Sequence, residues 1–357
     1  MPGAALQSTS AANGLHLSQC GINGDGASPE PGKGGFSPSQ FLVAGATRAA
    51  VVGAGAFGRN HARHYAANPT ATLVAVVDAD PVRAEAVASM YGAASFLDHR
   101  DLIGKVDAVS VAAPATLHHA VARELIDAGI HVLVEKPLAT TAANAADLVK
   151  LARKKGIVLA VGHVERFSPA IAELELRLDN ARRITAVRRT KWSGRSGDVD
   201  VVLDLMIHDI DLALTLARSP VASVSASGVV GVSGLVDEAE AWLTFANGAI
   251  ATLSASRVAD RNERRLTVTE PATTYAVDLS GPSLTATARR TPGAMPQEIA
   301  LVPHDNLGAE IAAFLAAVAG GRAVTVDGQA GLAAVEIAER IRAAIAENPA
   351  TLDAVTA

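Results

Sequence analysis

The residues best suited to chemistry begin with a glycine-rich segment. Gly53–Gly58 reads Gly-Ala-Gly-Ala-Phe-Gly, and Asp78 follows about 20 residues later. In a G-x-G-x-x-G loop the first glycine permits a tight turn, the second lets the backbone approach a pyrophosphate, and the third allows close helix packing. The spacing predicts a dinucleotide site. Because the Asp78 carboxylate would repel a 2′-phosphate, NAD is favoured over NADP, a preference that the nearby Arg83 weakens.

A lysine stands where a proton donor or acceptor would be useful. Glu135-Lys136-Pro137 directly follows a predicted strand, and in an open α/β sheet the carboxyl ends of strands face the ligand crevice. A cationic nicotinamide beside Lys136 would favour loss of its proton, which suits the residue to acid–base work. The alternative interpretation is a surface lysine that precedes a helix-starting proline.

A polar stripe marks a helix expected over residues 202–217. Asp204, His208, Asp211 and Thr215 are spaced i, i+4, i+7 and i+11 in an otherwise apolar segment. Burying a carboxylate beside an imidazole is costly unless the two satisfy each other, so Asp204 is expected to orient and stabilise His208 for proton transfer. The alternatives are a solvent-facing stripe and a metal site. One histidine among aspartates is a poor metal site, and no metal is predicted.

The elements that must position these residues fall into two groups. Continuous apolar strands alternate with helices up to residue 162, which indicates a doubly wound parallel sheet covered on both faces. Its strands are expected over residues 48–53, 72–78, 108–113, 131–135 and 157–162, and its helices over 57–67, 81–91, 117–128 and 142–154.

Strand-like segments then follow one another, which indicates an antiparallel sheet. They cover residues 185–192, 221–230, 239–245, 249–258, 265–269, 274–279 and 283–290, with helices over 169–178, 202–217, 307–319 and 331–347. The predicted domains are therefore an extension at 1–46, an NAD-binding domain at 47–162, and a substrate-binding domain at 163–357 with C-terminal helices.

Composition limits the setting and the partners. The 357 residues include 31 basic and 36 acidic side chains, a net charge of −5, which argues against nucleic acid as the main partner. The one cysteine, Cys20, excludes an internal disulfide framework and a multi-cysteine zinc site, and favours a reducing, cytoplasmic setting. The extension at 1–46 is rich in Gly, Ser and Pro and has no signal-peptide pattern or membrane span, so we interpret it as disordered or as a start codon assigned too early.

The chain from about Arg48 to Glu347 resembles the Gfo/Idh/MocA family of oxidoreductases. The matching motifs are, in order, Gly53-Ala-Gly-Ala-Phe-Gly58-Arg-Asn-His61, Ala113-Pro114-Ala-Thr-Leu-His118, Glu135-Lys136-Pro137 and Asp204-x-x-x-His208. The resemblance implies a Rossmann domain followed by an α+β domain on an open, mostly antiparallel sheet with helices on one face. Substrate would lie between that sheet and the nicotinamide. Lys136 and His208 would transfer the proton, with Asp204 as their polar partner.

The resemblance also guides the choice of ligand-binding residues. Those predicted to bind the cofactor are Gly53, Gly55, Ala56, Phe57, Gly58, Asp78, Ala113, Pro114, His118, Glu135, Lys136 and Trp192. Those predicted to bind substrate are His163, Arg166, Phe167, Arg195, Asp204 and His208. Arg166 and Arg195 could together serve a pyrophosphate, although Arg166 could instead pair with Glu165 or another acid. Trp192 could stack on the nicotinamide or a sugar face, or simply pack in the fold.

Two segments point to one branch of the family. Residues 162–167 (Gly-His-Val-Glu-Arg-Phe) and 206–211 (Met-Ile-His-Asp-Ile-Asp) look like the branch that oxidises UDP-N-acetylglucosamine at C3, whose keto product an aminotransferase consumes in lipid A or surface glycan synthesis. The alternatives are an inositol or free-sugar dehydrogenase, hydrolysis or elimination through a transient keto sugar with tightly held NAD, and a non-enzymatic NAD-binding sensor. An exposed sheet face would favour a homodimer or tetramer.

Overall fold

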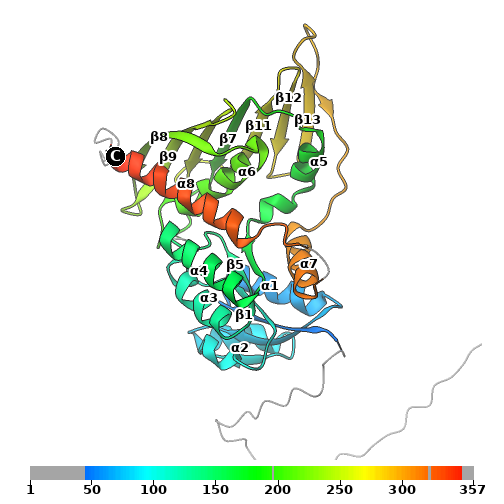
Figure 1. The fold of residues 1–357 in the computed structure, drawn as a ribbon, viewed down its shortest axis with the longest axis vertical. Coiled ribbons are helices and arrows are strands. Elements are labelled where there is room, and N and C mark those ends of the chain that lie inside the picture. Colours follow the sequence, from blue (N-terminus) through cyan, green and yellow to red (C-terminus); the bar gives the residue numbers. More distant parts are fainter. Residues whose placement is uncertain (1–44, 195–196, 321–322, 348–357) are drawn as a thin grey trace, which may run out of the picture. The chain divides into compact units, whose positions relative to one another are not determined.

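The computed structural model describes residues 45–194, 197–320 and 323–347. Most of the predicted extension, including Cys20, lies outside these residues, and so does Arg195. The described residues build two sheets, one from each half of the chain (Figure 1).

The first sheet has six parallel strands in the order β3-β2-β1-β4-β5-β6. The strands are β1 (Thr47–Val52), β2 (Ala71–Val77), β3 (Ala94–Phe96), β4 (Ala108–Val111), β5 (His131–Glu135) and β6 (Leu159–Gly162). The helices are α1 (Ala56–Ala67), α2 (Pro81–Ser89), α3 (His118–Asp127) and α4 (Ala142–Lys155), with 3₁₀ turns η2 (His99–Leu102) and η3 (Ala115–Leu117). The strand order reverses between β1 and β4, so the predicted doubly wound Rossmann sheet is confirmed.

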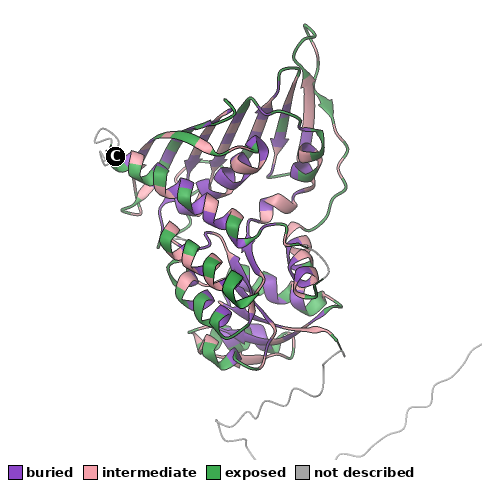
Figure 2. Ribbon diagram, viewed as in Figure 1, coloured by how far each residue is buried: buried purple, intermediate pink, exposed green. Residues whose placement is uncertain are grey.

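Local chemistry sets the helix ends in this half. Asp80 caps α2 by accepting hydrogen bonds from the backbone N–H groups of Val82 and Arg83. Thr141 caps α4 in the same way through Asn144, and Gly156 ends α4 in a left-handed conformation. Strand β4 is buried along its whole length and its neighbours β1 and β5 over most of theirs, because helices cover both faces of the sheet (Figure 2).

The second sheet has eight strands in the order β14-β13-β12-β11-β7-β10-β9-β8. They are β7 (Arg183–Arg189), β8 (Val221–Val230), β9 (Val236–Phe245), β10 (Ile250–Ser256), β11 (Glu263–Thr269), β12 (Thr273–Asp278), β13 (Ser283–Ala288) and β14 (Gln297–Glu298). Neighbours are antiparallel except β7 and β10, which run parallel. The predicted open, mostly antiparallel sheet is confirmed.

Helices cover one face of this second sheet. They are η4 (Val164–Phe167), α5 (Pro169–Arg177), η5 (Val202–Met206), α6 (Ile207–Ala217) and α8 (Gly328–Glu347). The other face is exposed, since β9 alternates strictly between buried residues and exposed ones such as Glu240 and Trp242. The segment η5 is a π-helical turn, which sequence periodicity did not predict.

The end of the chain returns to the first sheet. Helix α7 (Asn306–Val318) lies beside α1 (Figure 1), and its residues Ile311, Phe314 and Leu315 complete a buried cluster with β1 and α1. The backbone N–H of Val161 in β6 donates to the carbonyl of Val326, just before α8. The C-terminal helices therefore serve the cores of both halves.

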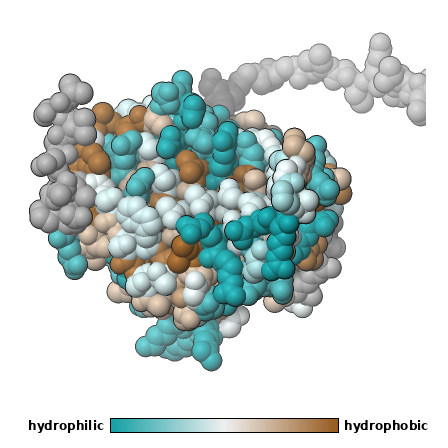
Figure 3. All heavy atoms as spheres, turned by 90° about the horizontal axis from the view of Figure 1, so that it is seen from above, coloured by the Kyte–Doolittle hydropathy of each residue, from teal (hydrophilic) through white to brown (hydrophobic). Residues whose placement is uncertain are grey.

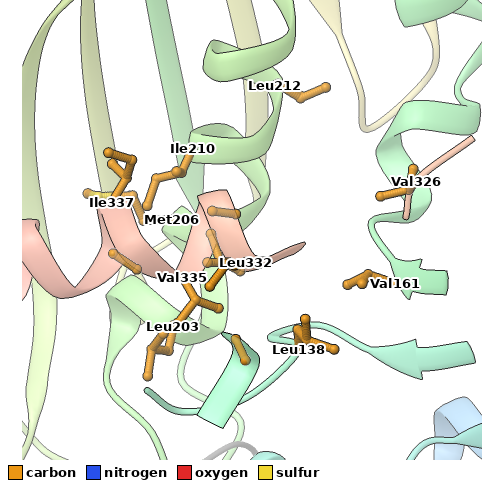
Figure 4. Close-up of a cluster of buried hydrophobic side chains, with 14 of the residues drawn as sticks. Leu138, Val161, Leu203, Met206, Ile210, Leu212, Val326, Leu332, Val335 and Ile337 are labelled. Carbon is orange, nitrogen blue, oxygen red and sulfur yellow. The ribbon is translucent and has the colours of Figure 1, made fainter. Parts of the chain in front are cut away.

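Helix α8 crosses from the first sheet to the second. Figure 4 shows Leu332 and Val335 pointing toward Leu203 and Met206 of the helical segment 202–217, while Val161 lies near the start of α8. The side chains labelled in Figure 4 are all aliphatic or methionine, and the larger buried cluster to which they belong also contains Phe245 and Tyr275.

The surface carries both kinds of side chain. On the face drawn in Figure 3, hydrophobic and hydrophilic side chains are interspersed, which is ordinary for a folded protein. Within the described residues, no helix combines the length and the apolar character needed to cross a membrane.

Candidate active site

The glycine loop between β1 and α1 fits a dinucleotide. Gly53 has a φ of +98°, and a Cβ there would lie 2.5 Å from the carbonyl oxygen of Ala112. A Cβ on Gly58 would lie 1.6 Å from the carbonyl oxygen of Gly53, so both positions require glycine. Gly55 has open space instead and directly precedes α1, whose first backbone N–H groups favour an anion. Ala56 and Phe57 at the same helix end are exposed.

Asp78 lies against this loop at the end of β2. Its carboxylate accepts hydrogen bonds from the backbone N–H of Ala54, at 2.8 Å, and from the guanidinium of Arg83, at 2.9 Å. Burial alone would raise the pKa of Asp78, but these bonds and one from the Asp80 N–H lower it overall. The carboxylate is thus charged at neutral pH and close to the loop, a position that suits its predicted role.

His118 braces two loops of the first sheet. Its Nε2 lies 2.9 Å from the carbonyl oxygen of Ala113, after β4, and its Nδ1 lies 2.7 Å from that of Pro137, after β5. Burial lowers the pKa of His118. We infer that this ring fixes the position of the neighbouring Lys136.

Glu135 is held by a buried network that includes residues sequence reasoning missed. His61 Nε2 lies 2.8 Å from Glu135 Oε1, and His61 Nδ1 lies 3.0 Å from Ser110 Oγ. The Tyr65 hydroxyl lies 2.7 Å from the same Ser110 oxygen. Burial would raise the pKa of Glu135, but His61 and the positive charge of Lys136 lower it overall. A side chain at Gly162 would meet Glu135, which explains the small residue there.

Lys136 joins the two halves of the protein. Its ammonium group donates to the backbone oxygen of Asp204 at 2.7 Å and to the Asp204 carboxylate at 3.2 Å. Asp204 therefore contacts Lys136, as the family resemblance implies, whereas the pairing of Asp204 with His208 that the helical spacing predicted does not appear. The reason is local: Asp204 lies in the π-helical turn η5, whose wider turn shifts the side-chain phase assumed in the i, i+4 pattern.

Two histidines lie next to each other beyond this pair. The rings of His208 and His163 are in a T-shaped arrangement with centroids 6.5 Å apart. Nδ1 of His208 and both ring nitrogens of His163 are buried and have no hydrogen-bond partner among the described residues. Burial first, and then the positive charges of Arg188 and Lys136, lower the pKa of His208 well below its usual range. Burial also lowers the pKa of His163. Both imidazoles are neutral at neutral pH.

A buried ion triad supports this region and was not predicted. Arg188 of β7 donates to the Asp209 carboxylate at 3.0–3.2 Å and to Glu165 at 2.9 Å. The side chains are 2%, 4% and 8% exposed, respectively. The three residues come from β7, α6 and η4, so no spacing in the sequence could reveal the triad.

The guanidinium group of Arg166 contacts other side chains of the protein and does not face a ligand cavity. Its guanidinium donates to the Thr215 hydroxyl and lies 3.5 Å from Asp211 and 3.6 Å from Glu175. Arg166 therefore follows the ion-pair alternative stated above, and its acidic neighbours are Asp211 and Glu175, not Glu165. Phe167 is partly buried and packs against the core. Neither residue is among those that line the cavities beside Lys136.

Two cavities meet at Lys136. One, of about 220 Å³, is lined mainly by residues of the first half, including Ala113, Pro114, His118 and Glu135. The other, of about 480 Å³, is lined mainly by the second half, including Trp192, His208 and Arg188. Phe57, Lys136 and Asp204 line both. A cofactor in the first and a substrate in the second would meet at these three side chains.

Comparison with known proteins places the chain in a family. The "Oxidoreductase family, NAD-binding Rossmann fold" model matches residues 47–163, and the "GFO/IDH/MocA C-terminal domain" model matches residues 170–270. The UDP-N-acetylglucosamine 3-dehydrogenase of Acidithiobacillus ferrooxidans is 37% identical over 305 residues, which cover 84% of this chain and 97% of that protein. The chain belongs to the Gfo/Idh/MocA oxidoreductase family.

Solved structures of Gfo/Idh/MocA relatives agree with the fold. That of the Acidithiobacillus enzyme has a TM-score of 0.79 and covers 84% of this chain and 98% of its own. GenD2 from gentamicin A biosynthesis, solved in complex with NAD, is 25% identical, with a TM-score of 0.75 over 88% of this chain and 98% of its own. An inositol 2-dehydrogenase of Rhizobium meliloti is 28% identical over 84% of this chain and 97% of that protein. The predicted NAD-dependent oxidoreductase class is confirmed.

Proposed function

We propose that this protein uses NAD to oxidise a secondary hydroxyl of a sugar nucleotide, converting UDP-N-acetylglucosamine to its 3-keto derivative. The observation that carries the proposal is the Lys136–Asp204 pair at the boundary of the two cavities. The substrate class rests on the 37% identity to the Acidithiobacillus dehydrogenase over nearly all of that protein.

The residues divide the work as follows. Bound NAD would supply the hydride acceptor, held by the glycine loop and Asp78. Lys136, acting as the neutral amine, takes the hydroxyl proton, and His208, whose neutral ring can accept a proton, receives it from Lys136. Asp204 positions the Lys136 ammonium group through two contacts, one from its backbone oxygen and one from its carboxylate.

The direct test is turnover. The protein is incubated with NAD and UDP-N-acetylglucosamine while NADH absorbance is followed, with glutamate and a partner aminotransferase added to consume the keto product. NADH formation with this substrate, and its competitive inhibition by UDP, support the proposal. NADH formation with an inositol, with no inhibition by UDP, would replace it with the inositol activity of the Rhizobium relative.

Replacing the proposed proton acceptor separates chemistry from binding. Lys136→Met should lower turnover by about 10²–10⁴-fold, the usual contribution of a general acid or base. Because Lys136 lies at the edge of the first cavity, the Kd of NAD should change little. Near-normal turnover in this variant would exclude Lys136 as the proton acceptor.

Three further features belong to the same proposal. The uncovered face of the second sheet, with Trp242 exposed on β9, is suited to self-association into a dimer or tetramer. An aminotransferase would consume the keto product. The reaction would take place in the cytoplasm. Size-exclusion chromatography with light scattering tests the self-association, and the coupled assay above tests whether an aminotransferase consumes the keto product.

A further inference from the structure

The second cavity has a cationic mouth whose charges the proton-transfer residues do not use. Lys191 and Arg264 line this cavity, and the exposed fraction of the Arg264 side chain is 47%. Their neighbours Arg188 and Arg257 are buried in ion pairs, with Asp209 and Glu165 and with Asp237, respectively. The two outer cations are thus the ones placed to meet a ligand.

Arg264 is held in place without being fully paired. It lies on β11 in register with Arg188 on β7, on the same side of the sheet. Its Nη1 is 3.7 Å from the Glu165 carboxylate, whereas Arg188 reaches the same oxygen at 2.9 Å. Because Glu165 already accepts the shorter bond, the guanidinium fork of Arg264 keeps donors available for an anion.

Lys191 lies beside the same strand end. It follows β7, and its backbone N–H donates to the Asn262 side chain at 3.3 Å, just before β11. Its own side chain is exposed and, in the part of the chain that the structure describes, pairs with no carboxylate. The bond to Asn262 ties the Lys191 segment to the start of the strand that carries Arg264.

We propose that Lys191 and Arg264 bind the diphosphate of a nucleotide-linked substrate and so make the cavity selective for sugar nucleotides over free sugars. A diphosphate offers several anionic oxygens, which match one planar fork and one flexible ammonium group. The sequence suggested Arg166 and Arg195 for this role. Arg166 is held instead by Thr215 and Asp211, and Arg195 lies outside the described residues.

The electrostatic field in the cavity agrees with this assignment. After burial, the largest influences on His208 are the positive charges of Arg188 and Lys136, and Arg264 adds to them in lowering its pKa. The side chains that line the cavity include five cations and two carboxylates, an excess of positive charge even though the chain has a net charge of −5. This field would attract a polyanionic substrate to the cavity.

This diphosphate subsite rests on the proposed function for the identity of the sugar. Whether it recognises a diphosphate can be tested by binding measurements alone. The probes are UDP and uridine, added in saturating NAD so that the dinucleotide site is filled. Trp192 lines the cavity, so its fluorescence reports binding, and a Trp242→Phe background leaves it as the single tryptophan.

The variants are Arg264→Gln and Lys191→Gln. Arg265→Gln is the matched control, because Arg265 is the next residue on β11 and points to the other face of the sheet. We expect each site variant to weaken UDP binding about tenfold, the size of one charged hydrogen bond. Uridine and NAD affinity should be unchanged, and higher salt should shrink the difference. Arg264→Lys, which keeps the charge but loses the fork, should fall between the wild type and Arg264→Gln.

The outcomes separate the subsite from the proposed function. The subsite is overturned if both site variants bind UDP as tightly as the Arg265→Gln control, or if saturating NAD abolishes UDP binding. Either result would overturn it even if the protein oxidises UDP-N-acetylglucosamine. Binding of UDP that depends on Arg264 and Lys191 supports the subsite even if no sugar nucleotide is oxidised, in which case it is the proposed function that fails. Unchanged NAD affinity in each variant shows that the protein is folded.

Discussion

The replacement Arg188→Met tests the buried ion triad most sharply. The guanidinium makes three hydrogen bonds to Asp209 and one to Glu165, and all three side chains are almost fully buried. Methionine fills a similar volume but leaves the Asp209 carboxylate without its cation and Glu165 with only the more distant Arg264, at 3.7 Å. Removing one partner of a buried ion pair typically costs about 3–5 kcal/mol of unfolding free energy, and we expect a loss in that range.

The assay is urea denaturation of the wild type and the variant at pH 5 and pH 8. Burial raises the pKa of Asp209, and Arg188 partly opposes this rise. Without the arginine the folded pKa rises further above the unfolded value. The resulting destabilisation is present above the unfolded pKa and is relieved as pH falls and the native carboxyl takes up a proton. The loss should therefore be larger at pH 8 than at pH 5.

A triple variant controls for the stranded charges. Arg188→Met combined with Asp209→Asn and Glu165→Gln removes the carboxylates together with the cation, so most of the lost stability should return. A loss below about 1 kcal/mol in the single variant at pH 8, or no recovery in the triple variant, would show that the triad does not stabilise the protein as reasoned.

Three other changes have defined outcomes. Gly58→Ala would place a Cβ 1.6 Å from the Gly53 carbonyl oxygen, so it should cost at least about 3 kcal/mol in urea denaturation and abolish NAD binding measured by calorimetry. Asp204→Asn should lower kcat by on the order of tenfold while the Kd of NAD is kept, because Lys136 retains the backbone oxygen as a partner. Glu310 is buried without a hydrogen-bond partner, and burial raises its pKa well above its usual range, so wild-type stability falls as pH rises above the unfolded pKa near 4.5. Glu310→Gln should remove this loss of stability. The unfolding free energy of the variant minus that of the wild type should grow by up to about 1.4 kcal/mol per pH unit above pH 4.5. A difference that does not depend on pH would contradict the raised pKa of Glu310.

Local patterns predicted much of the cofactor half. The glycine spacing, the acid after β2 and the continuous apolar strands are all consequences of short-range geometry, and the Rossmann sheet follows from them. Strand β3 was missed because Ala94–Phe96 is too short to show any periodicity. The doubly wound first sheet and the open second sheet also agree with expectation.

The candidate site was harder to predict because its contacts cross the fold. The helical spacing paired Asp204 with His208, but Asp204 contacts Lys136, the other partner that the family resemblance implied, since a π-helical turn does not follow the 3.6-residue period that the interpretation assumed. Arg188 and Arg264 are brought together with Glu165 only by the pairing of β7 with β11 and the packing of η4. A single sequence carries no periodic signal for such encounters.

The return of α7 to the first sheet constrains how the protein can be made. During synthesis the nucleotide-binding half emerges first, yet its buried cluster around Ala62 and Tyr65 lacks Ile311 and Phe314 until those residues leave the ribosome. The nascent first half must therefore remain partly open while the second sheet is translated. A fragment that ends at Gly162 should expose this apolar surface and aggregate, so the two halves mature together although the chain reads as two successive domains.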